Sequence, residues 1–125
     1  FKLYNDKNGH QAGDSLLKSF ANLLMNSSRI MDSVFRYGGD EFMVLFPETP
    51  KKDAVNLALR IELAVKEKKF EGLEFLSRRR LSCSIGVASF PEDGLSTEAL
   101  LFVADGMMYK AKSFRKNKVC FISPR

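Results

Sequence analysis

The middle of the chain carries the sequence RYGGDEFMVLF at residues 36–46. Apolar and aromatic residues on either side of its centre predict two buried strands. Gly38 and Gly39 predict a tight hairpin between them, because glycine adopts positive φ without steric cost. Asp40 and Glu41 follow at the mouth of this apolar hairpin, where carboxylates are uncommon unless a cation meets them. The stretch therefore indicates either an ordinary turn with solvated acids or a ligand or metal site on a rigid hairpin.

The composition indicates one soluble globular domain over residues 1–125, with 45% hydrophobic and 28% charged residues. No apolar run approaches membrane-spanning length and no signal peptide opens the chain, so we expect a cytoplasmic protein. Cys83 and Cys120 lie in apolar runs, which favours buried reduced thiols over a disulfide. The formal charge of +5 favours an anionic partner, and nucleotide, nucleic acid and acidic protein all fit it.

Hydrophobic periodicity predicts three amphipathic helices and further strands around the hairpin. Their order is typical of an α/β (α+β) fold with a central, mainly antiparallel sheet covered by helices. The chain opens abruptly at Phe1, so we expect the first strand to be missing and the domain to be truncated at its N-terminus. The predicted elements are a helix capped by Asp14 to about residue 25, strands over 34–37 and 42–46, a helix over 52–68, a strand over 81–88, a helix capped by Ser96 to about residue 113, and a strand over 118–122.

Gly38-Gly39-Asp40-Glu41-Phe42 resembles the signature of the GGDEF domains. Five specified residues arise by chance about once in a million windows at average residue usage. Other blocks that resemble the family follow one another in order across nearly the whole chain. These blocks are Phe1-Lys2 with Asn5-Asp6, Gly9-His10 with Gly13-Asp14, Ser84–Ala88 with Pro91–Gly94, and Ala104-Asp105 with Tyr109–Lys112.

The resemblance implies a diguanylate cyclase, which joins two GTP molecules into cyclic di-GMP and releases two pyrophosphates. It implies the antiparallel-sheet fold shared with nucleotide cyclases and polymerase palms, with Mg²⁺ as the cofactor. It also implies an antiparallel homodimer in which each domain presents one GTP, and an upstream sensor or receiver domain outside this chain. No nucleic-acid partner is expected from it.

On the hairpin, the resemblance assigns Asp40 and Glu41 to the Mg²⁺ site, with Asp40 also helping to deprotonate the ribose 3′-hydroxyl. Neighbouring carboxylates point to opposite sides of a regular strand, so they share a metal only if the turn bends the backbone. Gly38 and Gly39 permit that bend and let a nucleotide approach the main chain closely.

Substrate contacts are assigned from the same resemblance. An amide and a carboxylate suit the edge of guanine, and lysines suit phosphates. Without the resemblance, Asp14 would be a simple helix cap and the lysines a solvated helix face. Arg115-Lys116 stands where the family has Gly-Arg, which removes a bidentate donor that Arg115 partly replaces. The assigned residues are Asn5, Asp14 and Leu17 for the base, and Lys2, Lys112 and Lys116 for the phosphates.

Arg29 and Asp32 match the family's R-x-x-D motif at its usual spacing before the hairpin. The resemblance implies a second, inhibitory site there for cyclic di-GMP, which Arg60 completes. Arginine can grip guanine or phosphate bidentately, and aspartate can accept from the guanine N–H groups. The alternative is a surface ion pair that contributes little.

Two other functions stay open. A GGDEF domain can bind cyclic di-GMP or GTP without synthesis, and the family's metal-binding aspartate on the first strand lies before Phe1, outside this sequence. A basic nucleic-acid-binding α/β domain has only the charge in its favour, because the chain lacks an aromatic and basic recognition strand.

Overall fold

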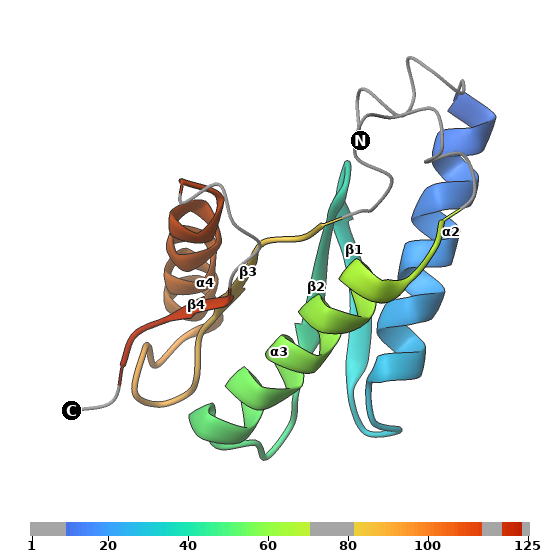
Figure 1. The fold of residues 1–125 in the computed structure, drawn as a ribbon. Helices are drawn as coiled ribbons and strands as arrows, with labels where there is room; N and C mark the ends of the chain where they lie inside the picture. The colour runs from blue at the N-terminus through green and yellow to red at the C-terminus, as the bar shows by residue number, and fades with distance from the viewer. Residues whose placement is uncertain (1–9, 71–81, 114–118, 124–125) are drawn as a thin grey trace. The chain divides into compact units, whose positions relative to one another are not determined.

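The computed structural model describes residues 10–70, 82–113 and 119–123, with side chains from residue 13 onward. The chain divides into two compact units, residues 1–47 with 64–81 and residues 48–63 with 82–125. A helix, a two-stranded hairpin, and then helices and single strands follow one another along it (Figure 1). Their order is α2 (His10–Ser27), β1 (Ser33–Gly38), β2 (Glu41–Leu45), α3 (Lys51–Glu67), β3 (Ile85–Val87), α4 (Thr97–Ser113) and β4 (Val119–Phe121).

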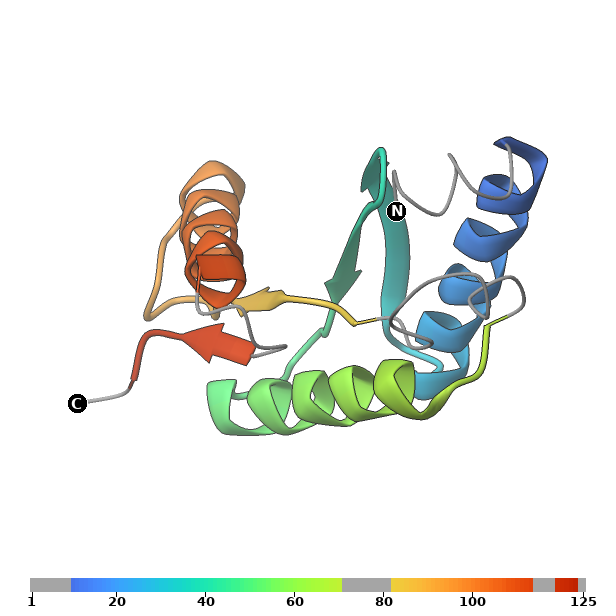
Figure 2. The ribbon, with the colours of Figure 1, turned by 45° about the horizontal axis from the view of Figure 1, so that its top comes forward.

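In the first unit, α2 packs alongside the antiparallel hairpin of β1 and β2 (Figures 1 and 2). The Phe20 ring of α2 lies 5.2 Å from the Phe42 ring of β2, centroid to centroid. This aromatic contact joins the helix to the strand that follows the acidic pair. The leucines that bury the inner face of α2 are Leu16, Leu17, Leu23 and Leu24, whereas Phe35, Tyr37 and Leu45 of the hairpin are exposed.

The predicted start of the first helix is wrong. The helix already includes His10, so Asp14 lies inside α2 with an exposed side chain and is not its N-cap. A single glycine such as Gly13 costs a helix only about 1 kcal/mol. Burial of Leu16 and Leu17 in the following turn offsets that cost.

In the second unit, α4 connects and packs against β3 and β4, which pair in parallel. Parallel neighbours need a crossover of this kind, because the chain must return to the same end of the sheet. The strand expected over 81–88 is shorter, since Ile85–Val87 pairs only with the three residues of β4. Residues 82–84 form no strand, and residue 81 lies outside the described part of the chain.

The predicted fold class is confirmed: helices flank small sheets in an α+β arrangement. Ser96 caps α4 as predicted, since its hydroxyl oxygen accepts a 3.1 Å hydrogen bond from the Ala99 amide. The apolar stripe of the middle helix, Ala54, Ala58, Ile61 and Val65, is buried. Cys83 and Cys120 are half-buried thiols. Among the residues described, no helix is long and apolar enough to cross a bilayer.

A buried ion pair that the sequence did not reveal ties the second unit together. The Lys51 ammonium at the start of α3 donates to Asp93 Oδ1 at 2.8 Å and to the Ile122 carbonyl at 2.9 Å. The other oxygen of Asp93 accepts from the Ser89 amide at 2.8 Å. Removing one member of such a pair costs about 3–5 kcal/mol, because the other charge stays buried. The pair therefore fixes the first turn of α3 to the turn before α4 and to the end of β4.

We expect Gly86→Ala to destabilise the protein strongly. A Cβ at Gly86 would overlap the backbone of α4 at the Ala104 carbonyl and the Met108 amide, neither of which can rotate away. The free energy of unfolding should fall by about 3 kcal/mol or more in chemical denaturation. Gly106→Ala is the matched control on α4, where a new methyl meets no atom within 4 Å. It should stabilise by up to about 1 kcal/mol, and equal stabilities for the two variants would contradict the close packing.

Candidate functional site

The acidic pair lies at the tip of the β1–β2 hairpin. Arg36 pairs with Phe42 and Gly38 pairs with Glu41, so the register shifts by one residue at Tyr37, a β-bulge. Gly39 has φ 52°, the left-handed conformation that favours glycine. Asp40 therefore lies in the turn itself and is exposed, whereas Glu41 begins β2 and is half-buried. Side chains alternate between the two faces only within a regular strand, and Asp40 precedes the strand. Asp40 is therefore not forced to the face opposite Glu41.

The hairpin tip also holds an arginine that the sequence interpretation did not use. Arg36 donates from Nε and Nη2 to the Gly39 carbonyl oxygen, at 3.0 Å and 2.7 Å. The sequence did contain a signal that could have drawn attention to Arg36, because it is the one cation in the otherwise apolar run 34–37.

The carboxylates of the tip suit a hard divalent cation. Neither Asp40 nor Glu41 forms an ion pair with another residue in the described ranges. No group of three or more His, Cys, Asp or Glu side chains that could hold a metal occurs within those ranges. Mg²⁺ commonly uses one or two protein carboxylates together with substrate phosphates and water. The two acids therefore fit Mg²⁺ in the presence of a phosphate-bearing ligand.

The residues assigned to the guanine base and the phosphates are only partly described. Asp14 and Leu17 lie on α2, in the same compact unit as the hairpin, with Asp14 exposed and Leu17 buried. Lys112 is exposed in the last turn of α4, in the other unit. The structure thus places two of the assigned residues in the unit of the acidic tip. Lys2, Asn5 and Lys116 lie outside the described residues.

Arg29 and Asp32 are brought together in the loop between α2 and β1. The guanidinium donates to both carboxylate oxygens, with Nη2 to Oδ1 at 2.8 Å and Nε to Oδ2 at 3.0 Å and to Oδ1 at 3.2 Å. The Arg29 amide adds a 2.7 Å bond to Oδ2. The Arg29 side chain keeps 36% of its exposure and the Asp32 side chain none. The carboxylate is covered, chiefly by hydrogen bonds from its own arginine, so it is less solvated than the surface pair of the alternative interpretation, while the arginine remains partly exposed.

Two features follow from the enclosure of Asp32. The hydrogen bonds from the Arg29 side chain hold the pKa of Asp32 below its ordinary value, against the opposing effect of burial. The four bonds from Arg29 also use the acceptor sites of the carboxylate, so in this conformation Asp32 orients Arg29. The guanidinium carbon of Arg29 lies 5.8 Å from the Phe46 ring centroid, a cation–π contact that adds a second restraint.

Arg60 is exposed on α3, in the other compact unit.

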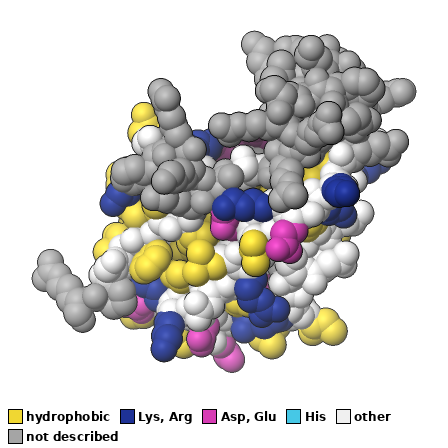
Figure 3. Space-filling model, in the orientation of Figure 1, with side chains coloured by type: hydrophobic (Ala, Val, Ile, Leu, Met, Phe, Trp, Pro, Cys, Tyr) yellow, Lys and Arg dark blue, Asp and Glu magenta, His cyan; other side chains and the backbone are white. Residues whose placement is uncertain are grey.

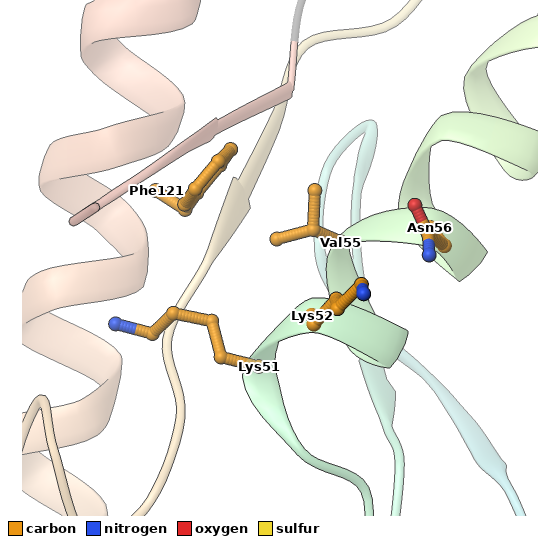
Figure 4. A pocket seen from close by; sticks show the side chains of 5 residues that line it. All are labelled: Lys51, Lys52, Val55, Asn56 and Phe121. Carbon is orange, nitrogen blue, oxygen red and sulfur yellow. The ribbon is translucent and has the colours of Figure 1, made fainter. Parts of the chain in front are cut away.

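A shallow hollow of about 230 Å³ lies between the first turns of α3 and β4 (Figure 4). Val55 and Phe121 contribute apolar side chains to its lining, and Lys51, Lys52 and Asn56 complete it. The Lys51 ammonium is neutralised by Asp93 and is not available to an anionic ligand. The hollow therefore lacks the convergent polar groups of a specific binding site.

One face of the described residues shows no continuous basic stripe. On the face drawn in Figure 3, Lys and Arg side chains lie singly or in small groups among apolar and acidic side chains. A continuous basic stripe is the usual electrostatic footprint of nucleic-acid binding.

The α+β arrangement, with a carboxylate pair on a glycine hairpin, is consistent with a palm-like fold, and the solved structures that it resembles are GGDEF domains. The family model described as "Diguanylate cyclase, GGDEF domain" matches residues 1–118. The chain therefore belongs to the GGDEF family.

Individual proteins agree with this assignment. The chain is 39% identical to the response regulator PleD of Caulobacter vibrioides, over 95% of this chain and 26% of PleD. It thus spans about a quarter of the length of that relative. The active GGEEF domain of a diguanylate cyclase from Vibrio cholerae is similar in structure, with TM-score 0.84, 28% identity and coverage of 99% and 77% of the two chains. The GGDEF domain of DgcB from Caulobacter crescentus, in complex with c-di-GMP, gives TM-score 0.79, 26% identity and coverage of 96% and 70%.

The lowered pKa of Asp32 predicts a stability contribution that depends on pH. Its carboxylate is charged and paired above the ordinary pKa of 3.8, and this contribution is lost as pH falls through the lower pKa of the folded state. We expect the unfolding free energies of the wild type and Asp32→Asn to converge as pH falls from about 5 to about 2. Urea denaturation over this range measures it. A difference between the two proteins that stays constant with pH would contradict the assignment.

Proposed function

We propose that this chain is the catalytic domain of a diguanylate cyclase that converts two GTP into cyclic di-GMP and two pyrophosphates. The observation that carries the proposal is the acidic tip, where Asp40 stands in a glycine turn beside Glu41 without an ion-pair partner among the described residues. A domain that only binds cyclic di-GMP has no need of two neighbouring carboxylates that form no ion pair with the protein's own cations. The family and the similarity to the Vibrio cholerae cyclase domain support the same function.

In the proposed reaction, each ribose 3′-hydroxyl forms a bond to the α-phosphorus of the facing GTP, and the bond to pyrophosphate breaks. The hydroxyl proton must be removed as this bond forms. Asp40 is the exposed carboxylate at the tip, and we assign it to accept this proton. Glu41 is more enclosed at the first position of β2 and supports the geometry of the pair.

Asp40 and Glu41 would also hold Mg²⁺, which neutralises the negative charge that develops on the phosphoryl oxygens when it is bound. The chain's own contributions are orientation and charge. Asp14 and Leu17 are proposed to receive the guanine base together with Asn5. Lys2, Lys112 and Lys116 are proposed for the phosphates. Gly38 and Gly39 leave the main chain of the turn open to the nucleotide, since no atom lies within 4 Å of a Cβ built on either one.

Arg29 and Asp32 are proposed, with Arg60, to bind the product and limit turnover. The enclosed carboxylate keeps the guanidinium fixed, so a ligand meets an arginine whose orientation is already determined. A bidentate arginine suits both the Hoogsteen edge of guanine and a phosphate. The c-di-GMP complex of the DgcB domain supports cyclic di-GMP as a ligand of such domains.

Further proposals concern assembly. Residues 1–125 act as one domain, and catalysis takes place in a homodimer because each domain presents one GTP. The chain is proposed to be the cytoplasmic output part of a larger membrane or soluble signalling protein with a sensor or receiver domain. The competing function is a receptor that binds cyclic di-GMP or GTP without synthesis. Incubation of the full-length protein with GTP and Mg²⁺, followed by chromatography, distinguishes the two, because a pure receptor forms no cyclic product.

Asp40→Ala and Glu41→Ala should each reduce formation of cyclic di-GMP by at least about a hundredfold, because each removes a ligand from the proposed cation site. Chromatographic quantification of the product measures the effect. Asp105→Asn is the matched control, since Asp105 is an exposed acid on α4 away from the hairpin sequence, and its activity should be unchanged. Unchanged turnover in both hairpin variants would show that the catalytic assignment is wrong.

Arg29→Ala should relieve product inhibition while synthesis is kept. Loss of a charge-assisted bidentate contact weakens cyclic di-GMP binding by between about tenfold and a hundredfold. The half-inhibitory concentration of cyclic di-GMP should rise by that factor. Because the single change leaves Asp32 enclosed without its cation, the double variant Arg29→Ala/Asp32→Asn should be measured beside it. Inhibition of the double variant at the concentration that inhibits the wild type would place the inhibitory site elsewhere.

A further inference from the structure

The glycine turn at the acidic tip has open space beside its two glycines. A Cβ built on Gly38 or on Gly39 meets no atom of the described residues within 4 Å, apart from its neighbours in the chain. Glycine also has the widest choice of backbone conformations of any residue. Turn types that share a positive φ at the first central residue differ in the orientation of the peptide group between the two central residues. In this hairpin that group is the peptide joining Gly39 to Asp40.

The Arg36 guanidinium is the contact that restrains this peptide. Its Nε and Nη2 groups converge on the Gly39 carbonyl oxygen at 3.0 Å and 2.7 Å, both within the range of good hydrogen bonds. A cationic donor makes these bonds stronger than neutral ones. Arg36 itself is positioned by the ladder, where it stands opposite Phe42, and Phe42 is fixed by its ring contact with Phe20 of α2. The restraint therefore runs from the helix, through the strand pair, to the turn.

Fixing this carbonyl also fixes Asp40. The peptide bond is planar and trans, so the Gly39 carbonyl and the Asp40 amide lie in one plane and point in opposite directions. A rotation of this peptide changes ψ of Gly39 and φ of Asp40 together, and it therefore alters the backbone from which the Asp40 side chain projects. The position of the Asp40 carboxylate relative to Glu41 thus depends on the orientation that Arg36 maintains.

We propose that Arg36 is a positioning residue for the acidic pair, holding the Gly39–Asp40 peptide in the single orientation that directs Asp40 to the reacting groups. The expected effect of Arg36 on turnover rests on the proposed cyclase function. Its expected effect on the conformation of the turn rests only on the hairpin geometry. Arg36 acts through the backbone of the tip, so it affects the rate of the bound complex more than substrate affinity. A displacement of about 1 Å in a catalytic group costs up to about a hundredfold in rate.

The kinetic test compares Arg36→Met and Arg36→Lys in the natural full-length protein. We expect Arg36→Met to lower kcat for cyclic di-GMP by between about tenfold and a hundredfold while KM for GTP changes by less than about threefold. Arg36→Lys keeps the charge and loses the two-pronged donor, so it should not restore the wild-type kcat. Lys52→Met removes an exposed cation from the first turn of α3 and should leave kcat unchanged. A wild-type kcat in Arg36→Lys, with the loss in Arg36→Met confined to KM, would overturn the proposal in favour of simple charge attraction.

A second measurement does not depend on activity. In protein labelled with ¹⁵N-glycine, the Gly39 amide resonance of Arg36→Met should shift and broaden, because exchange of the freed Gly39–Asp40 peptide changes ψ of Gly39, next to this amide. Gly106 on α4 provides an internal reference whose resonance should not change. An unaltered Gly39 resonance would overturn the proposal even if activity falls. A wild type that makes no cyclic di-GMP would remove the cyclase function, and the glycine resonances would still decide the role of Arg36 in the turn.

Discussion

The left-handed backbone of Gly39 is the constraint on which the acidic tip depends. In an uninterrupted strand, Asp40 and Glu41 would project to opposite faces and could not act on one group. With φ of 52° at Gly39 the chain reverses there, and Asp40 falls in the turn instead of the strand. The bulge at Tyr37 adds local twist on the opposite strand, so the last paired residues are Gly38 and Glu41. A side chain at position 39 would strain this conformation, which explains why the signature needs glycine there in physical terms.

Charged groups in the described part of the chain follow two patterns. Lys51 with Asp93, and Arg29 with Asp32, are pairs in which the carboxylate side chain is almost or fully enclosed, at 2% and 0% exposure. Lys51 and Asp93 are neutralised inside the protein, whereas Asp32 is covered by an arginine that is itself partly exposed. Asp40 is instead exposed at a turn and forms no ion pair with any residue in the described ranges. The contrast separates charges that hold the fold together from charges that remain available to a ligand.

Much of this arrangement could be predicted from sequence, because it depends on local signals. The hairpin strands, the cap at Ser96 and the apolar stripe of α3 each follow from residues within a few positions of one another. The Lys51–Asp93 pair could not be predicted, since its members are 42 positions apart and nothing in either neighbourhood marks the other. The short parallel ladder of β3 depends likewise on the length of a strand more than thirty residues away. Asp14 is a case in which a local signal misled. Aspartate often caps helices, so the helix was predicted to begin at Asp14, whereas α2 already includes His10.

The hairpin itself bears on the choice between an enzyme and a receptor. Two glycines are enough to close a hairpin, so a turn that only links two strands needs no cationic donor on its carbonyl. Arg36 nevertheless lies in an apolar run, and its exposed side chain donates from both Nε and Nη2 to the Gly39 carbonyl oxygen. Ordering a long side chain on the surface costs conformational entropy of up to about 2 kcal/mol, which the hydrogen bonds must offset. Such a contact is reasonable where the orientation of one peptide group matters to the residue that follows it. That residue is Asp40, to which the proposed cyclase reaction assigns proton removal and cation binding, whereas the proposed receptor function assigns it no role.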